Sequence, residues 1–431
     1  MFIRQLFYLI PTLYWEWGSR KKLEKRQLRM LNDFLQNAYY AVPYYRNNEA
    51  YSQLLTSLND IRKIPITNKA LVKKDCESFH SEKYCKPGKS IPLRTSGTTG
   101  EPIVFYHDSN SIDYNTSINF RRVFATKKYS PFYNTYHFTP IPREKMLCER
   151  FGLFRRTVIS CHLPISELKR IILEKKTKCI VSYPVHLGET IAAMSEEELK
   201  EARKFIKLIF TEAEMLTEQN RAFMQDSLNT EIFDDYGSWD VLTISYECSH
   251  HRSHICEDRL LLEILDDEGN PVPDGVEGNI IISSFMGKAM PLVRYDIGDR
   301  GIVSSEPCPC GRTFKTLKLT QGRTDYCIYL ENGEKIYTHT LLWLTCIVDG
   351  VRDIFIYQDK KGVVTVYFIP IDKEGRENDE IEAFILDYFI ENIGITPQIK
   401  ATDHVPKAES GKAQRIYSEL SEDEAMNLIV K

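Results

Sequence analysis

The spacing of apolar residues predicts an α/β fold for the first half of the chain. Helices are expected over residues 23–40, 109–125 and 218–228. Short buried strands are expected over residues 158–163, 179–182, 206–210 and 231–233. This alternation favours a sheet flanked by helices, in which ligands bind beyond the carboxyl ends of the strands. The loops after Phe210 and Phe233 are therefore candidates for a binding site.

The pattern becomes β-rich after residue 258. Two strands, over residues 259–265 and 278–284, flank a turn-rich segment. We expect a domain boundary close to Gly322, so that residues 1–324 form a large domain and residues 325–431 form a small α+β domain. Within the small domain, a hairpin is expected over residues 354–367 and a helix over residues 380–390.

Local signals near the N-terminus refine these elements. Pro43 is expected to end the helix that begins at residue 23, and Gln27 is a polar exception on the apolar face of that helix. Thr67 follows the extended segment Ile64-Pro65-Ile66 and is a candidate cap for a helix that begins near Asn68.

Composition excludes several classes of protein. The chain has 431 residues, of which 42% are hydrophobic and 27% charged, as in ordinary soluble proteins. The net charge of −4 gives no argument for a nucleic-acid partner. Eleven scattered cysteines do not indicate a disulfide framework, so we expect a reducing, cytoplasmic setting. No segment is long and apolar enough to span a bilayer.

The N-terminus is unusually rich in aromatic and aliphatic residues. Arg4 and Pro11 interrupt this segment and no small-residue cleavage site follows it, which argues against a signal peptide. Two interpretations stay open. The segment is either a first helix packed on the domain or an interfacial anchor that makes peripheral contact with a membrane, and the basic run that follows it favours the anchor. The basic run comprises Arg20, Lys21, Lys22, Lys25, Arg26 and Arg29.

A glycine-punctuated polar loop is the first candidate for chemistry. It consists of Thr95, Ser96, Gly97, Thr98, Thr99 and Gly100. Its glycines allow close approach of the backbone, and its hydroxyl and N–H groups can face phosphate oxygens. The loop is not a Walker motif, because it lacks Gly-Lys-Ser/Thr and a strand is expected after it. A solvated turn is the alternative.

Five short motifs follow one another in a specific order. They are residues 95–102, 235–240, 294–299, 321–325 and 406–412. Together they resemble the adenylate-forming superfamily of acyl and aryl ligases. The nearest branch is the phenylacetate–coenzyme A ligase family, including relatives found with capsular polysaccharide biosynthesis. The segments 41–46 and 64–69 also look like that branch, so the resemblance covers nearly the whole chain.

The resemblance implies a two-step reaction. A carboxylate attacks the α-phosphate of ATP, which yields an acyl-adenylate and pyrophosphate, and a thiol, amine or hydroxyl then displaces AMP. Because the first step is phosphoryl chemistry, positioning and charge neutralisation should dominate it. Coenzyme A is the default acceptor. The implied fold is a large α/β domain with a β-rich subdomain, followed by a small mobile α+β domain.

The resemblance also implies roles for individual residues. Tyr236 would stack on adenine, Asp299 would accept both ribose hydroxyls, and Lys412 would be the catalytic lysine, with Lys407 as its rival. From the residues alone, a core tyrosine, a turn aspartate and a solvated lysine are the alternatives. The other nucleotide-binding candidates are the loop from Thr95 to Gly100, Ala213, Glu214, Asp235, Gly237, Ser238 and Arg323. Asp325 would be the hinge between the domains.

The chain departs from the family pattern at three positions. Glu101 stands where the family usually has Lys, which removes a cation facing the phosphates. Trp239 replaces a hydroxyl residue and so removes one phosphate contact. Asp240 replaces the Glu that holds Mg²⁺ and takes part in catalysis; it keeps an anionic oxygen ligand but is one methylene shorter.

A cluster of cysteines and histidines is a candidate structural zinc site. Thiolate and imidazole ligands together favour Zn²⁺ in a closed tetrahedral site. Many phenylacetate ligase relatives look similar here, and that resemblance selects Cys248, His254, Cys308 and Cys310. His250, His251 and Cys256 are alternative ligands, and reduced cysteines without metal are the alternative to a zinc site.

Three functions are therefore considered. The first is an AMP-forming ligase that uses ATP, Mg²⁺ and a small carboxylate, with coenzyme A as acceptor. The second transfers the activated acyl group to an amine or hydroxyl of a sugar or lipid intermediate in surface polysaccharide assembly. The third is a divergent nucleotide-binding homologue with weak or no catalysis. This hypothesis is based on Glu101, Ala213, Trp239 and Asp240.

Overall fold

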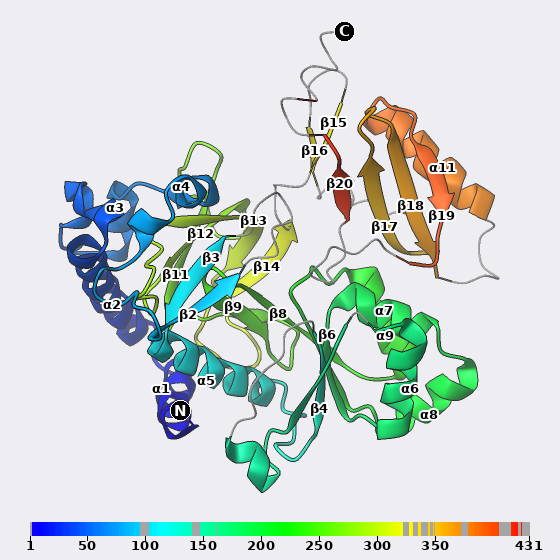
Figure 1. Cartoon of the computed structure of the whole chain (residues 1–431), viewed down its shortest axis with the longest axis horizontal. Helices are drawn as coiled ribbons and strands as arrows, with labels where there is room; N and C mark the ends of the chain where they lie inside the picture. The colour runs from blue at the N-terminus through cyan, green and yellow to red at the C-terminus, as the bar shows by residue number, and fades with distance from the viewer. Residues whose placement is uncertain are drawn as a thin grey trace. The chain divides into compact units, whose positions relative to one another are not determined.

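The computed structural model describes most of the chain, which forms two compact units (Figure 1). The first unit comprises residues 1–130, 146–150 and 233–320, and the second comprises residues 131–145, 151–232 and 321–431. The described residues are 2–94, 103–139, 147–161, 163–321, 327–330, 335–337, 344, 348, 350–371, 378–404, 415–420 and 424. The predicted domain boundary at residue 324 falls outside them and stays a prediction.

The first unit begins with two long helices, α1 (Phe2–Glu16) and α2 (Arg20–Ala41). The predicted helix over residues 23–40 is α2, which begins three residues earlier because the Ser19 side chain accepts a hydrogen bond from the Lys22 amide. Gln27, the polar exception, is buried and donates to the carbonyl oxygens of Glu257 (3.0 Å) and Leu260 (3.2 Å). A polar residue on the apolar face of α2 is thus explained by its hydrogen bonds to main-chain carbonyl groups at the start of β11.

Short helices and a hairpin complete the N-terminal part of this unit. They are α3 (Pro43–Arg46), the 3₁₀ turns η1 (Glu49–Tyr51), η2 (Leu58–Lys63), η3 (Glu77–Phe79) and η4 (Leu147–Phe151), and α4 (Lys69–Lys74). Strands β2 (Ser90–Arg94) and β3 (Val104–Asp108) pair antiparallel and lead into α5 (Ser109–Ala125). The predicted helix over residues 109–125 coincides with α5, because the Asp108 carboxylate accepts from the amides of Asn110 and Ser111.

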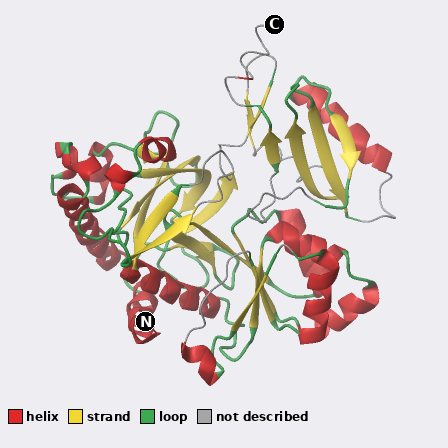
Figure 2. Ribbon diagram, viewed as in Figure 1, coloured by secondary structure: helices red, strands yellow, loops and turns green. Residues whose placement is uncertain are grey.

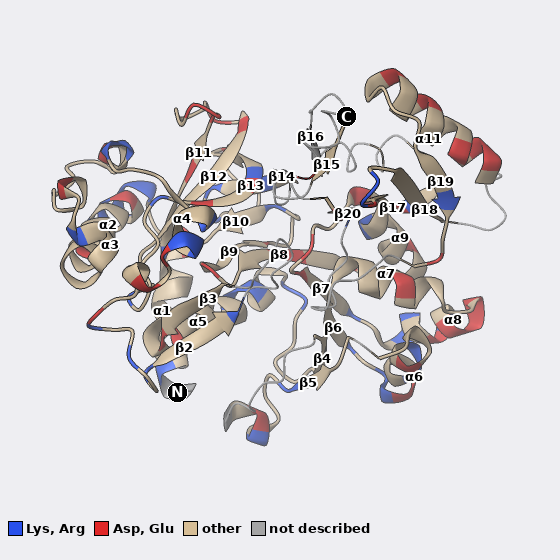
Figure 3. Cartoon of the chain, turned by 45° about the horizontal axis from the view of Figure 1, so that its top comes forward, with Lys and Arg blue, Asp and Glu red and all other residues tan. Residues whose placement is uncertain are grey.

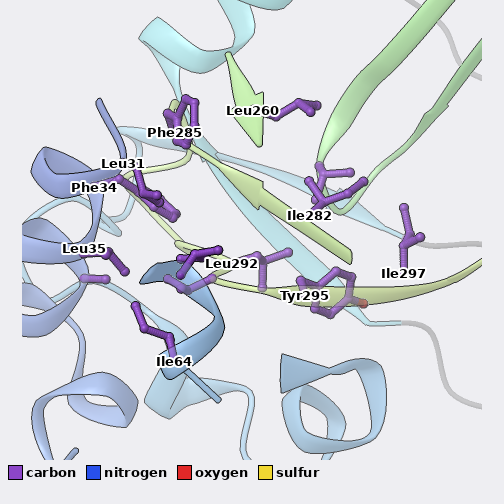
Figure 4. Close-up of a cluster of buried hydrophobic side chains, with 14 of the residues drawn as sticks. Leu31, Phe34, Leu35, Ile64, Leu260, Ile282, Phe285, Leu292, Tyr295 and Ile297 are labelled. Atoms are coloured by element: carbon purple, nitrogen blue, oxygen red, sulfur yellow. The ribbon is translucent and has the colours of Figure 1, made fainter. Parts of the chain in front are cut away.

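A mostly antiparallel sheet holds the centre of the first unit. Its strands lie in the order β11 (Leu260–Leu265), β12 (Glu277–Ser284), β13 (Tyr295–Ser304), β14 (Thr316–Gln321), β10 (Ser253–Ile255), β9 (Leu242–Glu247) and β8 (Ile232–Ser238). Figure 4 shows apolar side chains of α2, among them Leu31 and Phe34, beside Phe285, which follows β12; Leu260, Ile282 and Tyr295 of the sheet belong to the same buried cluster. Burial of this cluster is the main driving force for the unit.

Two N-terminal segments dock on the chain that enters β13. The buried hydroxyl of Tyr45 donates to the Pro291 carbonyl (2.8 Å) and accepts from the Val293 amide (3.3 Å). The short strand β1 (Thr67–Asn68) pairs parallel with Tyr295 and the residue after it. These contacts give a structural reason for the segments 41–46 and 64–69, which were noted in the sequence only as resemblances.

The predicted cap of the helix near residue 68 is wrong by one residue. Asn68, and not Thr67, caps α4, because its side chain accepts from the Leu71 amide at 2.9 Å. The Thr67 hydroxyl is already used, since it donates to the Val293 carbonyl at 2.8 Å. A hydroxyl that already has a buried main-chain partner cannot also cap the N-terminus of the helix.

We expect Tyr45→Phe to lower the free energy of unfolding of the first unit by about 1–3 kcal/mol, because the Pro291 carbonyl and the Val293 amide would lose their buried partner. Chemical denaturation measures this change. The control is Tyr44→Phe, since Tyr44 is only partly buried and its ring stacks on Phe79 whether or not the hydroxyl is present. Equal stability of the two variants would contradict this account.

The second unit contains a parallel sheet covered by helices (Figure 2). Its strands lie in the order β7 (Leu208–Glu212), β6 (Cys179–Ser182), β4 (Thr135–Phe138) and β5 (Arg156–Ile159). The helices are α6 (Ile165–Lys175), α7 (Pro184–Ala192), α8 (Glu196–Phe205) and α9 (Glu218–Leu228). The predicted bounds of β6 and α9 are confirmed. The strand predicted over residues 158–163 begins two residues earlier and ends four residues earlier, and the one predicted over residues 206–210 lies two residues later.

A second, mixed sheet lies in the C-terminal part of this unit. Its strands lie in the order β19 (Gln398–Ala401), β18 (Val364–Pro370), β17 (Val351–Gln358) and β20 (Ile416–Ser418), and α11 (Asn378–Asn392) packs on it. A separate hairpin consists of β15 (Cys327–Tyr329) and β16 (Lys335–Tyr337). The predicted fold class, an α/β part with a β-rich region and a small α+β part, is confirmed.

Candidate active site and metal centre

The structure brings the adenine and ribose candidates into direct contact. Tyr236 lies in β8 and Asp299 in β13, and the tyrosine hydroxyl donates to Asp299 Oδ2 at 2.5 Å. Asp299 is buried, so its carboxylate is held in one orientation by this bond. A carboxylate fixed in this way can accept hydrogen bonds from neighbouring hydroxyl groups of a ligand.

The segment that carries Tyr236 is a strand and not the loop that was predicted after Phe233. The strand continues because Asp235 and Tyr236 pair with β9, with a register shift before Gly237. A Cβ on Gly237 would lie 2.8 Å from the Leu242 carbonyl oxygen, so only glycine fits here. The bulge redirects the backbone of β8 immediately after the tyrosine.

Two carboxylates beside this strand have different environments. Asp235 is paired with the buried guanidinium of Arg122 from α5. Asp240 is buried beyond the strand, and its Oδ2 accepts from the Tyr295 hydroxyl at 2.9 Å. Its Oδ1 has no hydrogen-bond partner among the described residues. An unpaired buried carboxylate oxygen is costly, so this atom fits a hard cation such as Mg²⁺.

In the second unit, polar residues lie at the carboxyl ends of β4 and β7 and at the start of α7. His137 Nε2 lies 2.8 Å from Glu212 Oε1, and Ala213 has a φ of 69°, an uncommon conformation for a residue with a side chain. Glu214 accepts from the Val185 amide (3.4 Å) at the first turn of α7. A carboxylate at a helix N-terminus is stabilised by the helix dipole.

The four predicted metal ligands lie together in the first unit. The ligand atoms of Cys248, His254, Cys308 and Cys310 are all within 4.8 Å of one another, and all four residues are buried. Cys248 Sγ lies 3.7 Å from Cys308 Sγ, and Cys310 Sγ lies 3.2 Å from His254 Nε2. Three sulfurs and one nitrogen in this arrangement match the donor set of a closed zinc site.

The surroundings of His254 orient its ring and favour the neutral imidazole, the form that can bind a metal. Its Nδ1 donates to the Phe314 carbonyl (2.9 Å), which leaves Nε2 facing the sulfurs. Burial lowers the pKa of His254 to about 4, so the imidazole is neutral at pH 7. Burial raises the pKa of Cys310, but hydrogen bonds from Arg312 outweigh it and the pKa lies below its ordinary value. These two shifts favour the forms that bind metals, whereas burial raises the pKa of Cys248 and of Cys308, so these two thiols would lose their protons only on binding a cation.

The alternative ligands lie in other environments. The ring of His251 stacks on Phe233, and its Nδ1 lies 3.3 Å from Glu247. Cys256 is buried in a separate cluster with Tyr114 and Ile118. The His250 amide donates to Cys248 Sγ at 3.4 Å, which places the main chain and not the imidazole of this residue at the sulfur.

Comparison with known proteins finds relatives that match most of the chain. No family model matches the chain. The chain is 25% identical to a phenylacetate–coenzyme A ligase of Thermus thermophilus, over 92% of this chain and 96% of that protein. It is 22% identical to Protein CapK of Staphylococcus aureus, over 86% of this chain and 79% of that protein.

Solved structures show the same fold. A 2-hydroxyisobutyryl–CoA ligase in the postadenylation state, in complex with 2-HIB-AMP, superposes with a TM-score of 0.74 at 17% identity and covers 96% of this chain and 94% of that one. The chain belongs to the adenylate-forming ligase superfamily. It is an AMP-forming enzyme of the coenzyme A ligase-like kind, since its phenylacetate–coenzyme A ligase homologues match almost from end to end.

Several predicted site residues of this ligase homologue lie outside the described residues. They are Thr95, Ser96, Gly97, Thr98, Thr99, Gly100, Arg323, Asp325 and Lys412, together with Glu101 and Lys407. The flanks of the glycine loop are described: Arg94 of β2 pairs antiparallel with Val104 of β3. A strand therefore follows the loop, as expected for a loop that is not a Walker motif.

Sequence reasoning missed one buried residue, Glu16, that binds Arg312 beside the candidate metal ligands. The buried carboxylate of Glu16 accepts from Arg312 Nε (2.8 Å) and from the Tyr246 hydroxyl (2.7 Å). Thr313 also donates to the main chain at the end of α1, through its amide to Glu16 (2.8 Å) and through its hydroxyl to Gly18. The spacing of the polar residues Gln5, Thr12 and Glu16, all on one helical face, was the available signal.

Proposed function

We propose that the chain activates a carboxylate with ATP, releasing pyrophosphate, and transfers the resulting acyl group from the acyl-adenylate to coenzyme A. The contact between Tyr236 and Asp299 is the observation that carries this proposal, because it unites the two residues expected at adenine and ribose. The names of the phenylacetate–coenzyme A ligase relatives support the choice of acceptor.

In this mechanism the described residues position the nucleotide. Asp299 would accept the ribose hydroxyls while the Tyr236 hydroxyl holds its second oxygen in place. Asp240 would supply one carboxylate oxygen to Mg²⁺, which in such sites is completed by phosphate oxygens and neutralises their charge. Lys412 would place a cation on the charge that develops between the carboxylate and the α-phosphate.

The Cys248, His254, Cys308 and Cys310 cluster is proposed to hold one structural Zn²⁺. A bound metal would tie the turn after β9 to the loop between β13 and β14, two segments that are far apart in the sequence. The cluster has no open position for a substrate in a four-coordinate site, so its role would be to stabilise the unit.

A second candidate acceptor is an amine or hydroxyl of a sugar or lipid intermediate. The exposed apolar residues of α1, Phe7, Ile10, Tyr14 and Trp17, favour this candidate, because they suit an enzyme that works beside a lipid surface. Once a substrate acid is known, release of AMP in the presence of coenzyme A can be compared with release in the presence of such acceptors.

Carboxylate-dependent exchange of pyrophosphate into ATP tests the first step. We expect exchange with at least one acid in a library of aryl and alkyl carboxylates. Asp299→Asn should weaken ATP binding by about 10-fold or more, because a hydrogen bond to a charged group contributes about 1.5–3 kcal/mol. Asp296→Asn, three residues earlier on β13, is the matched control and should bind ATP as the unaltered protein does.

The outcomes separate the candidates. Exchange that is lost in Asp299→Asn and kept in Asp296→Asn supports the ligase. ATP binding without exchange for any acid supports a nucleotide-binding homologue. Equal ATP affinity of the two variants would remove Asp299 from the ribose site.

A further inference from the structure

Helix α1 packs on the first unit with its polar side. Gln5, Thr12 and Glu16 are each no more than 1% exposed. The Gln5 side-chain amide donates to Asp113 (3.0 Å), and the main-chain carbonyl of Gln5 accepts from the Ser117 hydroxyl (2.7 Å). The helix is therefore held against α5 and the metal centre mainly through polar contacts.

The opposite side of α1 is apolar and exposed. The exposed fractions are 70% for Phe7, 71% for Ile10, 55% for Tyr14 and 51% for Trp17. Spacings of three, four and three residues place these side chains along one face of a helix. The polar contacts of Glu16 and Gln5 prevent the helix from turning this face inward, so the exposure follows from how the helix is anchored.

Unpaired cations lie next in the chain, on the first turns of α2. Lys21, Lys22, Lys25 and Arg29 are exposed and form no ion pair in the part of the chain that the structure describes. The neighbouring basic residues face inward: Arg20 binds Glu257 (2.6 Å), and Arg26 donates to the Asp258 carbonyl (2.5 Å). Figure 3 shows basic residues along α2 in blue. The outward-facing cations are thus separate from those that hold the fold.

We propose that this surface, defined by Phe7, Ile10, Tyr14 and Trp17 of α1 and by the four exposed basic residues that follow on α2, binds reversibly to an anionic lipid surface. Aromatic and aliphatic side chains on one helical face enter the interfacial layer of a bilayer, and Tyr and Trp are favoured at that depth. Adjacent Lys and Arg residues add attraction to anionic headgroups. None of the helices in the described part of the chain is long and apolar enough to cross a membrane.

Charge argues for lipid over a second copy of the chain. In a two-fold dimer the same patch meets itself, and the residues that define the patch include no carboxylate to neutralise its four cations. Anionic headgroups supply the missing negative charge. The proposal does not depend on the ligase reaction.

Co-sedimentation of the full chain with vesicles tests the proposal. We expect binding to vesicles of phosphatidylglycerol and phosphatidylcholine, weaker binding at high salt, and little binding to phosphatidylcholine alone. Phe7→Ser with Ile10→Ser should lower partitioning about tenfold or more, and so should Lys21→Gln with Lys25→Gln. These four side chains make no contact with the metal centre, so folding, followed by thermal melting, should be unchanged.

Matched controls lie elsewhere on the same unit. Leu54→Ser removes another exposed apolar side chain, and Lys73→Gln with Lys74→Gln removes two exposed cations of α4. Both should bind vesicles as the unaltered protein does. Binding that is unaffected by all variants, or equal for the two lipid compositions, overturns the proposal. Absence of vesicle binding, together with a dimer that Phe7→Ser and Ile10→Ser dissociate, would instead assign the face to self-association.

Discussion

Lys412→Ala is expected to slow acyl-adenylate formation by about 10²–10³-fold, the range found when one electrostatic donor to a transition state is removed. The first half-reaction develops charge between the attacking carboxylate and the α-phosphate, and a lysine cation would stabilise it. The second half-reaction, displacement of AMP by the acceptor, does not use that interaction. The variant should therefore still consume a pre-formed acyl-adenylate.

Single-turnover measurement of each half-reaction distinguishes this role from a general loss of folding. Lys407→Ala is the matched control, since Lys407 lies in the same segment as Lys412 and its replacement removes the same charge. It should leave both rates within a few-fold of the unaltered enzyme. Equal loss of both half-reactions in Lys412→Ala, or the same defect in Lys407→Ala, would show that the catalytic lysine was assigned wrongly.

Cys308→Ser is expected to abolish tight metal binding and to destabilise the first unit. Structural zinc contributes about 10–16 kcal/mol of binding free energy in small zinc-binding peptides, so loss of one of four ligands should cost at least about 3 kcal/mol here. For a unit of this size, that corresponds to a fall of about 6–12 °C in the unfolding midpoint. Elemental analysis and thermal melting measure the two effects.

The control for this variant is Cys256→Ser. Cys256 is also buried, but it lies in a different cluster, so its replacement should keep about one metal per chain even if the melting temperature falls. Zinc content is thus the discriminating measurement. Absence of zinc from freshly purified, never-chelated protein, or equal zinc content in the two variants, would refute the metal site.

Local features of the fold could be predicted from the sequence, because local interactions determine them. The bounds of α5 and α9 were correct, since Asp108 and Thr217 cap the two helices within one turn. The end of β8 was missed, because its continuation to Ser238 depends on pairing with β9 and on the bulge at Gly237. Pairing between strands cannot be read from the periodicity of one of them.

The candidate site could be predicted only in part, for a similar reason. Tyr236 and Asp299 were selected by resemblance, but their hydrogen bond joins strands 63 residues apart and no local pattern encodes it. Of the two interpretations of the N-terminus, a first helix packed on its unit is confirmed, and the interfacial anchor stays a prediction, although α1 exposes an apolar face. The polar face of α1 was visible in the spacing of Gln5, Thr12 and Glu16, but no local pattern identifies Arg312 as the partner of Glu16.

The attachment of α1 also has a consequence for synthesis of the chain. The Glu16 carboxylate binds Arg312, which is 296 residues further along, so this contact cannot form until nearly three quarters of the chain has left the ribosome, whereas the contacts of α1 with α5 can form earlier. At about 5–20 residues per second, this delay is about 15–60 s. During that interval the apolar side chains of α1 are accessible to chaperones and to any nearby bilayer, before the first unit can close.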